Sequence, residues 1–187
     1  MAEVATAPPS YSTVTRWLHW LTAIVVIATI PVGVIMITEG LPRNVQNTLF
    51  IFHKNVGVVI LLLVLARLIA RAMTTTPPLP DAMPAWQKRA AAFSHAALYI
   101  LLLVMAISGY VRVRAGGFPI EALDALGVPP LVPRSEPLAE TAKWVHSNAR
   151  FVLAAFIFLH IGAALQHGLI KKDGVFSRIW RARPAKQ

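Results

Sequence analysis

Residues 144–170 read WVHSNARFVLAAFIFLHIGAALQHGLI, and this stretch decides the fold of the chain. An apolar run of this length can cross the hydrocarbon core of a bilayer as a helix, which takes about 20 residues. The run is continuous rather than alternating, which argues against a membrane strand. It nevertheless contains His146, His160 and His167, and ionisable side chains at membrane depth usually mark a functional site. The stretch predicts a membrane helix that carries functional histidines.

The composition of the whole chain is that of a membrane protein. Of its 187 residues, 56% are hydrophobic and 14% are charged, whereas soluble domains carry about 25% charged residues. The net charge of +10 does not indicate a nucleic-acid partner, because the basic residues lie in short segments beside apolar runs and form no soluble recognition motif. The absence of cysteine excludes disulfides, iron–sulfur clusters and covalently attached c-type haem.

Three further apolar runs complete a predicted all-α, integral membrane bundle of four transmembrane helices. The helices are expected at about 15–37, 49–71, 90–112 and 145–170. They form one domain over residues 11–180, with tails at 1–10 and 181–187. The first run is too long for a signal peptide and is followed by no cleavage site, so we expect it to be retained. Pro31 lies inside it, where a kink is tolerated if neighbouring helices satisfy the freed carbonyl.

The basic residues of the loops predict that both termini are cytoplasmic. Arg16, the segment 67–89 and the C-terminal tail carry eleven Lys and Arg residues, whereas the opposite side carries six that are offset by five acidic residues. Residues 74–84 are expected to form a Pro-rich cytoplasmic linker without a helix. The external loop at about 114–143 is expected to form short helices, for example over 120–126, that cover the outer membrane face.

The histidines fall at two depths of this bundle. Fourteen helical residues rise about 21 Å and make nearly four whole turns, so His146 and His160 lie on one face of the last helix at two levels, and His167 follows on the same face. With helices that alternate in direction, His53 is the partner of His146 at the outer level. The partner of His160 at the inner level is either His19 or His95. Two imidazoles from facing helices are natural axial ligands for haem iron, so the pattern predicts two b-type haems, one above the other.

Glycines and cations accompany both levels. Gly33 and Gly109 lie near the outer level, where they would leave clearance for a macrocycle; ordinary close packing of helices is the alternative interpretation. Haem propionates require cations, and interfacial anchoring is the alternative role of these side chains. The candidates are Lys54, Arg112, Arg114 and Arg150 at the outer level and Arg16 and Arg67 at the inner level. A zinc or copper site is disfavoured because no carboxylate or thiolate shares the spans, and a histidine proton relay would not explain two levels.

The combined pattern resembles the bacterial cytochrome b-561 family, in the di-haem type that includes superoxide:ubiquinone oxidoreductase. The resemblance covers residues 11–180 and is carried by Arg16-Trp17-Leu18-His19-Trp20, His53-Lys54-Asn55-Val56-Gly57, His95, Trp144-Val145-His146, and His160 with Gln166-His167. It implies that His53 and His146 ligate the outer haem, and His19 and His160 the inner haem. It further implies a quinone site near His95 and His167, with Arg67 or Arg71 nearby.

The resemblance implies a function in the bacterial inner membrane. Electrons would pass from periplasmic superoxide through the two haems to ubiquinone, without an obligate protein partner. Lys54, Arg112, Arg114, Lys143 and Arg150 would form a positive mouth that attracts a small anion, unless they only neutralise propionates. The alternative function is an electron conduit and anchor for a partner dehydrogenase or a cytochrome c, for which the sequence offers no identifiable docking surface. A haem-free transporter-like bundle is a third hypothesis.

Overall fold

The computed structural model describes residues 10–180, and all regular secondary structure in that range is helical, without a strand. The predicted tails and Arg181, Arg183 and Lys186 lie wholly or largely outside the described residues. Four helices are long and apolar enough to cross a membrane, which confirms the predicted all-α membrane fold. The long helices are α1 (Thr13–Ile35), α2 (Arg43–Met73), α3 (Ala85–Ala115) and α5 (Glu136–Leu165), and the short elements are α4 (Glu121–Ala125), the π-helix η1 (Gln166–Lys171) and α6 (Ser177–Trp180).

Helices α2, α3 and α5 begin earlier than the apolar runs alone predicted, whereas α1 ends at Ile35 rather than at about 37. Helix α2 begins directly after Pro42 and α3 directly after Pro84, because proline is compatible with a helix start. Helix α5 begins at Glu136 rather than at about 145, and the Ser135 hydroxyl accepts a hydrogen bond from the Leu138 amide as its N-terminal cap. The polar turns at these ends carry little hydropathy signal, so the apolar runs marked only the membrane portion of each helix.

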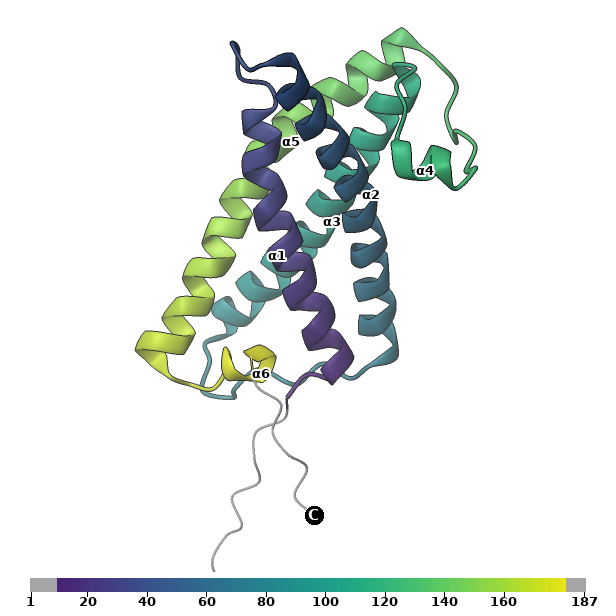
Figure 1. The fold of residues 1–187 in the computed structure, drawn as a ribbon. Helices are drawn as coiled ribbons and strands as arrows, with labels where there is room; N and C mark the ends of the chain where they lie inside the picture. Colours follow the sequence, from purple (N-terminus) through teal and green to yellow (C-terminus); the bar gives the residue numbers. More distant parts are fainter. Residues whose placement is uncertain (1–9, 181–187) are drawn as a thin grey trace, which may run out of the picture.

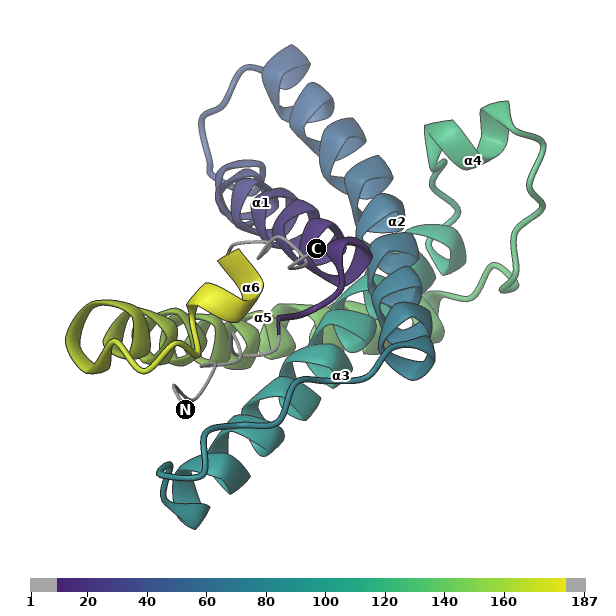
Figure 2. The same ribbon diagram turned by 90° about the horizontal axis from the view of Figure 1, so that it is seen from below.

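The four long helices form two pairs that are joined through α2 and α3 (Figure 1). Helix α1 packs along α2, α3 packs along α5, and α2 contacts α3, whereas neither α1 nor α2 packs its backbone along α5. Seen from below, the ends of α3 and α5 splay apart (Figure 2). A small buried core lies at the centre of the bundle and consists of Val26, Ile60, Val64, Leu102 and Leu153.

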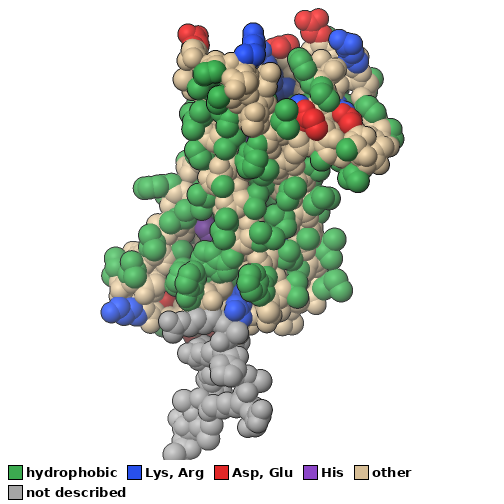
Figure 3. All heavy atoms as spheres, in the orientation of Figure 1, with side chains coloured by type: hydrophobic (Ala, Val, Ile, Leu, Met, Phe, Trp, Pro, Cys, Tyr) green, Lys and Arg blue, Asp and Glu red, His purple; other side chains and the backbone are tan. Residues whose placement is uncertain are grey.

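Most other apolar side chains face outward. Ile24, Leu62 and Phe158 are 64%, 60% and 78% exposed, and hydrophobic side chains cover the visible face between the two ends, with a histidine visible among them (Figure 3). Such a surface is suited to lipid, in which exposed apolar side chains carry no penalty. The exposed faces therefore agree with a multi-pass membrane protein.

The two ends of the bundle are distinguished by their short helices. On the α4 side, α4 lies beside the end of α3 and the beginning of α2 (Figure 1). On the terminal side, α1 begins and α6 packs against it, because Trp20 donates a hydrogen bond to the Ile179 carbonyl at 3.0 Å and its ring meets that of Trp180 edge-on. Residues 74–84 form no helix, as predicted, and Arg178 bonds to the Pro78 carbonyl in this linker.

Candidate functional site

The first pair of histidines lies on the α4 side. His53 projects from α2 and His146 from α5, and their ring centres are 6.2 Å apart with the ring planes at 84°. The two helices are not packed backbone to backbone. The backbones of α2 and α5 are therefore apart at this level, and only the two imidazole side chains approach one another.

The second pair lies on the terminal side and repeats this arrangement. His19 of α1 and His160 of α5 have ring centres 6.2 Å apart, with the planes at 60°. His95 of α3 is closer to His160, with ring centres 5.4 Å apart. The structure thus brings together all three histidines that the sequence offered for the inner level.

The separations fit iron between two of these rings. Two metal–nitrogen bonds of about 2 Å, together with two distances of about 1.1 Å from nitrogen to ring centre, place the ring centres about 6 Å apart. Both 6.2 Å pairs meet this requirement, whereas the 5.4 Å separation of His95 and His160 is short for it. Within residues 10–180, no group of three or more His, Asp or Glu side chains is arranged to hold a metal ion by itself. The distances therefore favour His19 over His95 as the partner of His160.

Each long helix contributes one residue to the α4-side level and one to the terminal-side level, and these two residues are fourteen positions apart. Each histidine on the α4 side rests against a glycine of the neighbouring helix, because a β-carbon at Gly33 would lie 2.9 Å from Cε1 of His53, and one at Gly109 would lie 3.1 Å from Cε1 of His146. The glycines were predicted to clear a macrocycle, but the atoms nearest to them belong to imidazole rings. The α4-side level holds Gly33, His53, Gly109 and His146, and the terminal-side level holds His19, Arg67, His95 and His160.

The second ring nitrogens of the histidines have different partners. Nδ1 of His146 lies 2.9 Å from the Met105 carbonyl and 3.2 Å from the Ser108 hydroxyl. A carbonyl only accepts, so His146 donates from Nδ1 and its Nε2 remains available to a metal, the usual arrangement for a ligating histidine. Nδ1 of His19 instead lies 3.1 Å from the Arg67 guanidinium, which also lies over the ring of Tyr99.

His53 differs from both. Its Nδ1 is buried and makes no hydrogen bond to the described part of the chain, although the Thr29 carbonyl lies near it. The orientation of the His53 ring is therefore held less firmly than that of His146, whose Nδ1 contacts both Met105 and Ser108.

Carboxylates neutralise part of the positive charge that was predicted for the mouth, and the sequence analysis did not assign these carboxylates to it. Lys54 pairs with Glu121 at 2.7 Å, Arg114 with Asp124 at 2.5 Å, and Lys143 with Glu140. The hydrogen bond from Arg114 is the main cause that lowers the pKa of Asp124, and therefore keeps this carboxylate ionised. Lys54 and Arg114 thus hold α4 in place, and their pairing weakens the positive mouth; a role of either toward a propionate or an anion stays a prediction.

Arg112 and Arg150 remain as the cations closest to the α4-side pair. Both are near enough to interact electrostatically with His146, and neither forms an ion pair within residues 10–180. Nε of Arg150 is buried and without a hydrogen-bond partner there, as is Nε of Arg16 near the terminal-side pair. Unpaired guanidinium nitrogens fit the propionates of a haem, which the donor geometry of arginine suits.

The residues predicted for a quinone site lie on the terminal side in two groups. His95 is close enough to Arg67 and Arg71 for their charges to act on it. His167 lies in η1, and its Nδ1 is 2.5 Å from Asp173. Burial raises the pKa of Asp173, but the contacts with His167 and the Val175 amide outweigh it and leave this pKa below its ordinary value. Sequence reasoning missed Asp173, because nothing in the local pattern pairs it with His167.

Two histidine pairs stacked along one four-helix membrane bundle define a membrane b-type cytochrome. The family model of the prokaryotic cytochrome b561 family matches residues 10–182, and the chain belongs to that family. It is similar to cytochrome b561 homolog 2 of Escherichia coli (strain K12), with 29% identity over 173 residues that cover 92% of each chain. It is also similar to cytochrome b561 homolog 1 of the same organism, with 28% identity over 169 residues, 89% of this chain and 94% of the other. No solved structure matches the chain. The predicted family is therefore confirmed, and with it a role in electron transfer and the binding of b-type haem.

Proposed function

We propose that the chain holds two b-type haems and passes electrons from its α4 side to its terminal side. The observation that carries the proposal is the 6.2 Å separation of both His53–His146 and His19–His160. Bound between these rings, the haems supply reversible one-electron chemistry at two depths of the membrane. The chain holds the ligand rings at the required separation and encloses them in apolar surroundings.

The proposed donor is superoxide on the periplasmic side of a bacterial inner membrane. Arg112 and Arg150 support this choice, because unpaired cations near the α4-side pair attract a small anion. The described terminal side carries eight Lys and Arg residues against two acidic ones, which supports cytoplasmic termini. The eight are Arg16, Arg67, Arg71, Lys88, Arg89, Lys171, Lys172 and Arg178, and the two are Asp81 and Asp173.

The proposed acceptor is ubiquinone on the terminal side. Two superoxide ions give up one electron each and become two molecules of oxygen, and ubiquinone takes up both electrons with two protons to become ubiquinol. His95, Arg67, Arg71 and His167 offer donors for a quinone carbonyl at this level. His95 lies next to the proposed ligand His160, so a quinone bound to it would be close to the electron source.

A second candidate is an electron conduit that serves a partner dehydrogenase or a cytochrome c. The neutralisation of Lys54, Arg114 and Lys143 favours this candidate, because the α4 side attracts anions less strongly than five free cations would. A protein donor would then be needed to deliver electrons.

Purified protein in lipid nanodiscs with ubiquinone distinguishes the two candidates. We expect a haem count of two per chain and ubiquinol formation on addition of superoxide alone, above the rate of a haem-free control. Turnover that requires an added protein donor would contradict the superoxide proposal and support the conduit. A colourless protein would contradict both.

A further inference from the structure

We propose that Glu121 of α4 is a positioning residue for His53, because it fixes the rotation of α2 at the turn that carries this ligand. The proposal rests on the proposed ligation of a haem by His53. Glu121 is 68 residues away from His53 in sequence, and it would act through the two residues that follow His53.

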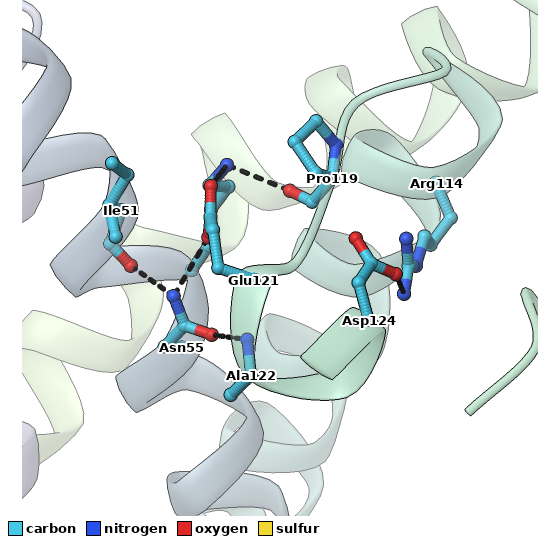
Figure 4. Close-up of polar contacts among 8 residues, drawn as sticks. Ile51, Asn55, Arg114, Pro119, Glu121, Ala122 and Asp124 are labelled. Atoms are coloured by element: carbon cyan, nitrogen blue, oxygen red, sulfur yellow. Dashed lines mark hydrogen bonds and ion pairs between the residues drawn. The ribbon is translucent and has the colours of Figure 1, made fainter. Parts of the chain in front are cut away.

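One carboxylate holds both of these residues (Figure 4). Lys54 donates to one oxygen of Glu121 at 2.7 Å, and the side-chain amide of Asn55 donates to the other at 2.8 Å. Lys54 also donates to the Pro119 carbonyl, and the side-chain oxygen Oδ1 of Asn55 accepts from the Ala122 amide at 2.8 Å. The segment 119–122 thus binds α2 through four hydrogen bonds immediately after the ligand.

These bonds restrain rotation of the helix about its own axis. Successive residues of an α-helix point about 100° apart, so Lys54 and Asn55 hold α2 from two different directions. Since His53 belongs to the same turn, the direction of its side chain follows from theirs. A small rotation of α2 would move the ring of His53 against or away from its seat on Gly33.

The other end of α4 is attached to α3. Arg114 is 7% exposed and pairs with Asp124, and Ile120 at the start of α4 is 1% exposed. Helix α3 also carries Gly109, on which His146 rests. Helix α4 therefore connects the helix that carries His53 to the helix that supports His146, and so maintains the spacing of the pair.

His53 needs such support more than its partner His146 does. His146 is oriented by the Met105 carbonyl, whereas Nδ1 of His53 has no hydrogen-bond partner in the described structure. Partners behind a ligand usually fix the ring of a metal-bound histidine. For His53, the contacts of α4 with α2 would take over this task.

The test compares Glu121→Ala and Glu121→Gln with Glu140→Ala in the full-length protein. Glu140 is also on the α4 side and paired with a lysine, but that pair lies within the first turns of α5. We expect Glu121→Ala to release one of the two haems about tenfold faster to excess apomyoglobin, at the lower end of the range for groups behind a metal ligand. The ferric EPR signal of that haem should shift while the other signal stays unchanged, and the Gln variant should lie between Ala and wild type. A His19→Ala background, which is expected to keep only the α4-side haem, identifies the affected site.

Haem release and EPR signals equal to those of Glu140→Ala in both Glu121 variants would overturn the proposal. Equal effects on both haems would also overturn it, because they would indicate general destabilisation. A wild-type protein without two haems would instead contradict the proposed function, so the two failures are distinguishable.

Discussion

Gly33 of α1 lies so close to His53 of α2 that a β-carbon at position 33 would be 2.9 Å from Cε1 of the imidazole. Heavy atoms do not approach this closely without displacement, so the ring can occupy its place only because residue 33 lacks a side chain. Gly109 and His146 repeat the relationship between α3 and α5 at 3.1 Å. The α4-side pair is therefore shaped by the helices behind the ligands as much as by the ligands themselves.

Gly33→Ala should displace His53 and weaken the binding of one haem. The substitution improves intrinsic helix propensity by roughly 0.5–1 kcal/mol, so it does not weaken the helix itself. A loss of haem would therefore result from displacement of the His53 ring. Haem content and the optical spectrum of the purified protein measure the effect, and Gly109→Ala should act in the same way through His146. Gly162→Ala is the matched control, because a β-carbon there meets nothing within 4 Å. Loss of haem from the control as well would refute this interpretation.

Replacement of single histidines by alanine should separate ligands from neighbours. His19→Ala, His53→Ala, His146→Ala and His160→Ala should each lower the haem count from two to one, because a single imidazole holds a haem weakly. His95→Ala should keep both haems, since its 5.4 Å separation from His160 is short for two iron–nitrogen bonds. A pyridine haemochrome assay gives the count. A count of one for His95→Ala and two for His19→Ala would reverse the assignment at the terminal side.

Superoxide oxidation should be fastest at low ionic strength if Arg112 and Arg150 attract the anion. Salt screens exposed charges beyond about 10 Å at 0.1 M, so the rate should fall as salt is added. Arg112→Gln and Arg150→Gln should lower the rate and flatten the salt dependence, as measured by stopped-flow kinetics with the protein in nanodiscs. The double variant Glu140→Gln/Lys143→Gln should change little, because it removes both charges of a neutral ion pair. A rate independent of salt would exclude electrostatic attraction without affecting the haem assignment.

Acidification should release α4 from α3. The pKa of Asp124 lies below its ordinary value of 3.8, mainly because Arg114 donates a hydrogen bond to the carboxylate. A carboxylate whose pKa is lowered by folding contributes stability above its ordinary pKa, and this contribution is lost as the pH falls through the pKa of the folded state. Protease cleavage within 116–135 should therefore accelerate below about pH 4 in the wild type. In Asp124→Asn, cleavage should already be fast at neutral pH and change less with acidification; unchanged cleavage in this variant would contradict the role of the pair.

Sequence periodicity was sufficient to predict the four long helices and the two depths at which the histidines lie. An apolar run of about 20 residues specifies a membrane helix by its length alone, and fourteen residues return a helix to the same face at a different depth. His146 and His160 could therefore be placed at two levels on one helix, and the fold class predicted from these local rules is the one observed. A short helix over 120–126 was also predicted, and the structure has one at Glu121–Ala125.

Tertiary structure decided the contacts that helical periodicity left open. The sequence left His19 and His95 equally available to His160, and only the packing of α1 and α3 around α5 sets their separations at 6.2 and 5.4 Å. It also counted Lys54 as a free cation, because Glu121 lies 67 residues further along the chain and no local pattern joins the two. Helical periodicity depends on neighbours within a few residues, whereas these contacts depend on how separate helices rotate and pack, which the order of residues along one helix does not specify.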